Sequence, residues 1–443
     1  MPRRLTTLLT VEHWRIGASL MRISLGMWGV FFYVLHWRVR HALWGPDGYL
    51  PFEKFRELGA TFNLFQLSRS VLYFEVVYHV AILIAVLLLV GFWPRLIVPL
   101  HWGMIWSFQE RNQLLGDGGD NLMRIVLLFL VLVNAGAYFS IFAMRHAGSH
   151  GPQRPAAAWL ARGLDSLRPA LAVVHNFGVL LILVQLCLLY MSTGFYKVMG
   201  ELWQNGTALY YILRVDEFSW PGVAELIYRN PYLVVLGTYG TVLFEVTFAP
   251  SLLNRWTRYL MIGTGLFFHI GTAMLMGLVT FGWSMLSVYP LLITDKEYES
   301  MAAWFRRRFG LTVFYDGWCP MCVRSVEWLA RLDLLALLRC ISFREPGVVE
   351  RYGLNPRRAA KRIQTATASG EIREGIDSMI DIAARSLVLW PAVPLLMLCR
   401  LLAGQRGYDA VASRRLILIP GACEGHCGLE ERPAVETRGS AMR

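Results

Sequence analysis

The pair of cysteines in the segment YDGWCPMC, which begins at Tyr315, offers the clearest chemistry in this sequence. Cys319 and Cys322 are separated by two residues, and the apolar periodicity that follows them predicts that they open a helix. Amide groups at a helix N-terminus favour the thiolate of the first cysteine, and the second cysteine, one turn further on, can release a mixed disulfide. We therefore predict that Cys319 is a redox nucleophile and that Cys322 resolves the intermediate.

A structural zinc site is the main alternative for this cysteine pair. Such a site needs a second pair of ligands, and Cys423 and Cys427 in the segment CEGHC could supply them. The expected order of strand, turn and helix around Cys319 favours redox chemistry, and we predict no bound metal. With zinc, the protein would be a non-enzymatic membrane immunity or transport-accessory protein.

Ionisable side chains also lie within and between the apolar segments that precede Thr294. Such side chains are costly in a membrane and are candidates for function, although mutual pairing is the simpler explanation for any one of them. Two polar segments stand out: RNQLLGDGGDN, which begins at Arg111, and GFYKVMGELWQNGTA, which begins at Gly194. The candidates in this part of the chain are Arg22, Arg111, Asn112, Asp120, Lys197, Trp203, Glu245 and His269.

The composition predicts the elements that must position these residues. The chain has 443 residues, of which 55% are hydrophobic and 17% charged, and its mean hydropathy is +0.43. These values are typical of a membrane protein. The formal net charge of +12 is spread between apolar runs, which excludes nucleic acid as a partner and indicates membrane topology. We predict about eight spans, roughly at residues 18–37, 71–93, 96–109, 122–143, 169–190, 232–250, 258–277 and 279–294.

Charged residues become frequent after Thr294, and six of the seven cysteines follow that point. We predict a helical membrane bundle over residues 1–294, a linker over 295–310, an α/β domain over 311–420 and a tail over 421–443. The arginines between the predicted spans favour a cytoplasmic N-terminus and C-terminal domain, although those of the first loop would lie outside. We expect the bundle to lie in the inner (plasma) membrane.

The segment YDGWCPMC resembles the DCC family of thiol-disulfide oxidoreductases. Asp316, Cys319 and Cys322 match the family's Asp-x-x-Cys and CxxC pattern, and the resemblance extends over about residues 311 to 415. It implies a thioredoxin-like fold and a catalytic role for these three residues. A dithiol or disulfide protein, or a small thiol, would be the partner.

The segment from about residue 14 to 294 resembles the HTTM family, the membrane domain of the vitamin K-dependent gamma-carboxylase and its bacterial relatives. Arg22, the two polar segments, Glu245 and His269 carry this resemblance. It implies that Lys197, otherwise explained as an anchor at the membrane edge, is a base. It also implies that the remaining candidates bind a quinone or a vitamin K-like hydroquinone. The large lumenal region with which the carboxylase holds its glutamate substrate is missing here.

Together these features predict a fused membrane redox protein. A thiol-disulfide oxidoreductase domain would be coupled to a bundle, embedded in the lipid bilayer, that binds a lipophilic quinone-like molecule. A gamma-carboxylase or hydroquinone epoxidase with Lys197 as base remains the alternative enzyme.

Overall fold

A computed structural model describes residues 9–58, 62–141, 155–216, 219–220, 222–333 and 335–413, and the side chains of all but 155–166 and 411–413 among them. The chain divides into two compact units, Met1–Glu297 and Tyr298–Arg443. The predicted tail over 421–443 and the end of the predicted α/β domain lie outside the described residues.

The first unit is helical. Among the residues that the structure describes, five of its helices are long and apolar enough to cross a membrane: α2 (Arg15–Leu35), α5 (Val71–Val90), the Leu167–Met199 part of α9 (Pro155–Met199), α13 (Pro231–Ser251) and α14 (Arg255–Met276). The other helices are α3 (Arg40–Trp44), α4 (Phe52–Glu57), η1 (Leu64–Gln66), α6 (Pro94–Arg111), η2 (Gln113–Leu115), α7 (Gly118–Leu130), α10 (Glu201–Gln204), α11 (Ala208–Ile212), α12 (Val223–Tyr228), α15 (Val279–Leu286) and η4 (Tyr289–Leu292).

Three of the eight predicted spans are short or charged helices in the structure. Helix α6 carries charged residues near both ends, α7 has 13 residues, and α15 has eight before the chain turns into η4. A span needs about 20 mostly apolar residues. The membrane character of the chain is supported by the five longer helices, whereas the number eight is not confirmed.

Helices α2 and α5 pack closely along the core of this unit. A β-carbon at Gly26 would lie 2.5 Å from the backbone nitrogen of Leu89, so only glycine permits this approach. Nearby, Trp28 and Tyr33 of α2 and Tyr78 of α5 are fully buried. Small residues at the crossing and aromatic residues beside it fix these two helices against each other.

The segment predicted as a linker is a helix, α16 (Asp295–Phe309). Its first residue, Asp295, belongs to the first unit, which is called the membrane unit below. The Asp295 carboxylate accepts the backbone N–H groups of Arg15 at 3.0 Å and Ile16 at 2.9 Å. These are first-turn amides of α2, which lack partners within their own helix.

The second unit contains a small mixed sheet with strand order β2-β1-β3-β4. Strand β1 (Leu311–Tyr315) pairs in parallel with β2 (Leu338–Ser342) and antiparallel with β3 (Gln364–Thr367), which pairs antiparallel with β4 (Ile372–Glu374). The helices are α17 (Pro320–Leu332), α18 (Val348–Tyr352), α19 (Pro356–Lys361), α20 (Ile376–Arg385), η5 (Leu387–Leu389) and α21 (Ala392–Ser413).

Alternating residues of β1 pack against helices on opposite faces of this sheet. Phe314 packs with Val348 of α18 and Ala359 of α19. Val313 packs with Leu329 of α17 and Ile382 of α20, as the period of a strand requires. Helix α17 is therefore fixed on one face by its apolar side, and its N-terminus follows directly from the end of β1.

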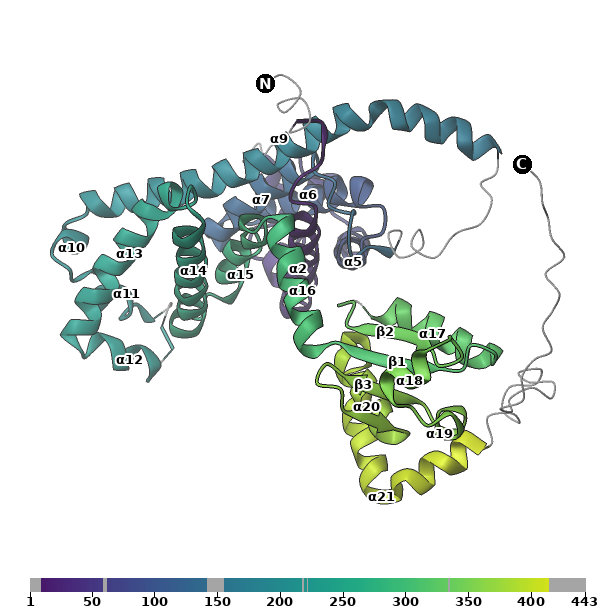
Figure 1. Ribbon diagram of the computed structural model, residues 1–443. Coiled ribbons are helices and arrows are strands. Elements are labelled where there is room, and N and C mark those ends of the chain that lie inside the picture. Colours follow the sequence, from purple (N-terminus) through teal and green to yellow (C-terminus); the bar gives the residue numbers. More distant parts are fainter. Residues whose placement is uncertain are drawn as a thin grey trace, which may run out of the picture. The chain divides into compact units, whose positions relative to one another are not determined.

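Helix α21 bends sharply within its length (Figure 1). The bend falls at Gly404, whose φ of 54° lies in the left-handed region that glycine tolerates best. The first part of α21 leaves large apolar side chains exposed, including Leu401 at 82% and Leu402 at 76%.

Candidate active site

The two cysteines of the CxxC pair lie where β1, a short turn and α17 meet. Cys319 is the N-cap residue of α17, Pro320 occupies the first helical position, and the N–H of Val323 donates to the carbonyl of Cys319 at 3.0 Å. Proline costs nothing there because first-turn N–H groups lack helical partners. Both cysteines are thiols in the structure. The positive end of the helix dipole thus lies beside the Cys319 sulfur.

Asp316 organises the turn that carries Cys319. Its Oδ1 accepts the backbone N–H of Trp318 at 3.0 Å and Nε of Arg344 at 3.1 Å, and its Oδ2 accepts Nη2 of Arg344 at 3.0 Å. The Arg344 guanidinium also lies over the Trp318 ring, 4.2 Å from its centroid. The Asp316 carboxylate is therefore committed to Arg344 and to the backbone of the turn, which makes Asp316 a positioning residue.

Gly317 brings the turn close to the end of β2. Its N–H donates to Oγ of Ser342 at 3.2 Å, and a β-carbon at this position would lie 2.5 Å from the same oxygen. A side chain at Gly317 would require the Ser342 hydroxyl, which accepts this hydrogen bond, to move. The glycine in the motif thus has a steric reason.

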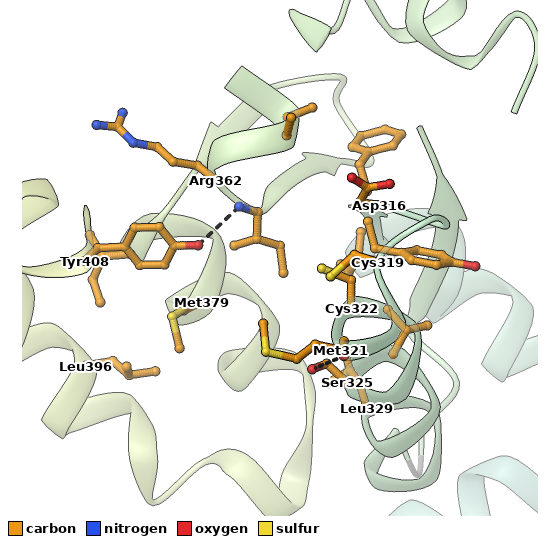
Figure 2. Close-up of a pocket in the computed structure, with 18 of the residues that line it drawn as sticks. Asp316, Cys319, Met321, Cys322, Ser325, Leu329, Arg362, Met379, Leu396 and Tyr408 are labelled. Carbon is orange, nitrogen blue, oxygen red and sulfur yellow. Dashed lines mark hydrogen bonds between the residues drawn. The ribbon is translucent and has the colours of Figure 1, made fainter. Parts of the chain in front are cut away.

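Cys319 and Cys322 open into a cavity of about 750 Å³ within this domain. Figure 2 shows the two thiols side by side at the start of α17, with Met379, Leu396 and Tyr408 across the cavity from them. Cys319 is only 5% exposed, whereas Cys322 is half-buried. The little exposed surface of Cys319 thus lies where its side chain lines the cavity.

Arg362 and Tyr408 close the far side of the cavity. Arg362 donates to Asp409 at 2.7 Å and to Glu374 at 2.8 Å, and its hydrogen bonds with Asp409 are the main cause that raises the pKa of Arg362 above its ordinary value. The Tyr408 hydroxyl accepts the backbone N–H of Ile363 at 3.2 Å (Figure 2). These contacts hold α21 beside the start of β3.

Sequence reasoning missed Arg344, Arg362 and the cavity. No local pattern marks Arg344, which lies 28 residues after Asp316. It reaches Asp316 because parallel pairing aligns Tyr315 with Ser342, so that the residues just beyond the two strand ends meet.

In the membrane unit, three predicted residues lie together. Lys197 of α9 donates to both carboxylate oxygens of Glu245 of α13, at 2.7 and 2.9 Å, and its ammonium lies 5.3 Å from the centroid of the Trp203 ring. The Glu245 side chain is 6% exposed. A buried carboxylate of this kind is stable because it is paired.

His269 of α14 takes part in a second buried polar group. The Tyr190 hydroxyl lies 2.6 Å from Nε2 of His269 and 2.8 Å from the Tyr289 hydroxyl. Nδ1 of His269 is buried and makes no hydrogen bond with any residue that the structure describes. Tyr190 precedes Lys197 by seven residues on α9, about 10 Å along a helix. The two tyrosines were not predicted, since tyrosines in apolar segments carry no sequence signal.

The other predicted cofactor ligands lie elsewhere. Arg22 donates to four backbone carbonyls, among them Leu88 and Leu89 at the end of α5. Arg111, at the end of α6, donates to the carbonyls of Gly45 and Leu50.

Asn112 and Asp120 likewise make local contacts. Asn112 donates to the carbonyl of Leu43. Asp120 completes a capping box with Asp117, the N-cap residue of α7. The structure therefore does not bring Arg22, Arg111, Asn112 and Asp120 together with Lys197, Glu245 and His269 into one site.

The zinc alternative depends on residues outside the described part of the chain, Cys423 and Cys427. Within that part, no three His, Cys, Asp or Glu side chains form a group that could hold a metal ion.

Comparisons with known proteins support the two units separately. Residues 313–419 match the family model described as DCC1-like thiol-disulfide oxidoreductase. The N-terminal half is similar to two Bacillus subtilis proteins. One is "Uncharacterized protein YitO", 25% identical over 240 residues, which are 52% of this chain and 70% of YitO.

The other is "Sporulation-delaying protein SdpB", 26% identical over 236 residues, which are 52% of this chain and 68% of SdpB. No solved structure matches. The predicted resemblance of the first unit to the gamma-carboxylase membrane domain is not shown by these matches and stays a prediction.

Proposed function

We propose that the protein is a membrane-anchored thiol-disulfide oxidoreductase whose reaction takes place at Cys319 and Cys322. The observation that carries this proposal is the cysteine pair at the start of α17, which lines a cavity in a domain that matches the DCC1-like family model. The strand order β2-β1-β3-β4, with α17 and α20 packed on one face, supports a thioredoxin-like fold.

The reaction is a two-step thiol-disulfide exchange. The thiolate of Cys319 attacks one sulfur of a substrate disulfide, forms a mixed disulfide and expels the other sulfur as a thiolate, which takes up a proton. The thiolate of Cys322 then attacks the Cys319 sulfur, so that the second substrate sulfur leaves and a Cys319–Cys322 disulfide forms. Two electrons pass from the protein to the substrate, and an external dithiol restores the reduced pair.

Replacing each cysteine in turn tests this proposal. We expect Cys319→Ser in the full-length, detergent-solubilised protein to abolish disulfide reduction with dithiothreitol as the electron donor. Cys322→Ser should trap a mixed disulfide on Cys319 that mass spectrometry detects. Cys340→Ser is the matched control, because Cys340 lies on β2 and does not line the cavity. Unchanged turnover in Cys319→Ser would refute the proposal.

As a second part of the function, we propose that the membrane bundle binds a lipophilic quinone near α9, α13 and α14. Lys197 and the buried Nδ1 of His269, which has no partner among the described residues, are groups suited to hold quinone carbonyl oxygens. A bound quinone would supply two-electron redox chemistry to the membrane unit. Lipid extraction of the purified protein followed by mass spectrometry tests this part, and the absence of any co-purifying quinone from protein made in quinone-replete membranes would refute it.

We further propose that the bundle lies in the inner (plasma) membrane, with the N-terminus in the cytoplasm. The domain that contains Cys319 and Cys322, here called the thiol domain, would also lie in the cytoplasm. The arginines between the apolar runs support this orientation. Labelling the exposed Cys399 in intact cells and in inverted vesicles with a membrane-impermeant maleimide tests it. Labelling in intact cells would contradict the proposed orientation.

A further inference from the structure

We infer that the cavity beside Cys319 and Cys322 binds an uncharged, apolar group attached to the substrate disulfide, and that it discriminates against charged disulfides such as glutathione disulfide. This inference rests on the proposed oxidoreductase function and narrows its substrate class. It follows from which side chains line the cavity and from the contacts in which its charged side chains are already engaged.

Most of the side chains that line the cavity are apolar, and three helices contribute many of them. Val326 and Leu329 of α17, Met379 of α20 and Leu396 of α21 line it together with the two thiols. Its volume of about 750 Å³ is in the range of ligand sites that enclose a small molecule or a side chain. Because Cys319 is 5% exposed, the substituent on the attacked sulfur has to occupy this space while the mixed disulfide forms.

The charged side chains that line the cavity are Asp316 and Arg362, and both are engaged elsewhere. Asp316 pairs with Arg344 at 3.0 Å, and Arg362 donates to Asp409 and Glu374. A substrate carboxylate or ammonium would have to displace one of these pairs or enter the cavity without a partner. Burying an unpaired charge is strongly unfavourable, so this site selects against it.

Two polar side chains of the wall, Tyr408 and Ser325, are engaged as well. The Tyr408 hydroxyl accepts the N–H of Ile363, and Ser325 donates to the carbonyl of Met321 at 2.9 Å. An apolar group loses nothing by contacting them, and it replaces water along the aliphatic wall. The energetic gain therefore comes from apolar area, with the thiols supplying the chemistry.

Three disulfides that differ in the group next to the sulfur test this inference. Two are mixed disulfides of N-acetylcysteine amide, one with 2-phenylethanethiol and one with 2-mercaptoethanol, and the third is glutathione disulfide. The pre-reduced full-length protein is mixed with each, and released thiols are quantified over time by mass spectrometry. We expect kcat/KM for the phenylethyl compound to exceed that for the hydroxyethyl compound about tenfold or more, since a buried phenyl group gains far more apolar contact.

Two substitutions on α21 distinguish an effect of the cavity wall from any effect of placing glutamine on this helix. Leu396→Gln places an amide in the wall, whereas Leu402→Gln alters a residue that is 76% exposed and does not line the cavity. Partition of the substrates into detergent is the same for the unchanged protein and both variants. The ratio of kcat/KM for the phenylethyl compound to that for the hydroxyethyl compound therefore reports on the cavity. We expect Leu396→Gln to reduce the preference at least about threefold and Leu402→Gln to retain it.

The outcomes distinguish this inference from the function on which it rests. Reduction of all three disulfides at similar rates, a preference for glutathione disulfide, or equal loss of preference in both variants would overturn the inference and leave the oxidoreductase function intact. No reduction of any disulfide would overturn both. A phenylethyl preference that only Leu396→Gln weakens supports the inference.

Discussion

The ion pair between Asp316 and Arg344 should be the main stabiliser of the turn that carries Cys319. Their side chains are 8% and 11% exposed. Removing one member of a buried ion pair costs about 3–5 kcal/mol, because the remaining charge loses its counterion. Because Arg344 also lies over the Trp318 ring, which partly compensates its charge, we expect Asp316→Ala to cost about 3 kcal/mol.

Hydrogen exchange of the full-length protein, followed by mass spectrometry, measures this cost within one unit of a two-unit chain. A loss of about 3 kcal/mol lowers the protection of the slowest amides of β1 and α17 by about a hundredfold, since 1.4 kcal/mol corresponds to a factor of ten. The double variant Asp316→Ala/Arg344→Ala should cost less than the sum of the two single variants, by about 1–3 kcal/mol.

A surface ion pair in the same domain provides the control. Arg373 and Glu371 are 2.9 Å apart but 42% and 57% exposed, and exposed pairs contribute little. Glu371→Ala should therefore leave the protection of β1 nearly unchanged. Equal effects of Asp316→Ala and Glu371→Ala, or strict additivity in the double variant, would refute the role we assign to the Asp316 pair.

Two further predictions concern other buried groups. Burial, with repulsion from Asp333, raises the pKa of Cys340 from 9.0 to about 11. At about pH 8, Cys340 should therefore react with iodoacetamide far more slowly than the exposed Cys399. Equal rates, measured by peptide mass spectrometry, would contradict this prediction. The unfolded thiol loses its proton near pH 9, while the folded thiol retains it to about pH 11. The contribution of the protonated Cys340 thiol to the free energy of unfolding is therefore complete below about pH 9 and is lost as the pH rises through about 11. In the bundle, Lys197→Met should lower the thermal unfolding temperature in detergent more than Lys197→Met/Glu245→Leu. The reason is that the single change leaves a buried carboxylate unpaired, which costs about 3–5 kcal/mol of stability. An equal or larger decrease in the double variant would contradict this prediction.

The cysteine pair could be located from the sequence because eight contiguous residues specify it. Strand, turn and helix follow one another directly along the chain, and Pro320 suits its position for a local reason, whereas the reason for Gly317 is its approach to Ser342 of β2. Arg344 could not be found in this way, since its place beside Asp316 depends on the pairing of β1 with β2. The cavity likewise depends on the position of α21, which is held by the contacts of Arg362 and Tyr408.

Hydropathy identified the long apolar helices but not the number of spans. Segments such as α15 are apolar because they pack inside the unit, and composition alone does not distinguish a short buried helix from a span. Composition also does not show which groups an arginine in an apolar helix contacts. The role of Arg22 as a cofactor ligand stays a prediction, and in the structure Arg22 donates to the carbonyls of Leu88 and Leu89 at the end of α5, which need donors because a helix leaves its last carbonyls unpaired.

The contact between Asp295 and the start of α2 bears on the order of biosynthesis. Trp14, the N-cap residue of α2, makes no side-chain capping bond, and the first-turn amides of Arg15 and Ile16 depend on a carboxylate 280 residues away from Arg15. During translation, the carboxylate that accepts the first-turn amides of α2 is absent until nearly all of the membrane unit has been made. These contacts at the start of α2 therefore cannot form until the chain has been made as far as Asp295, the first residue of α16.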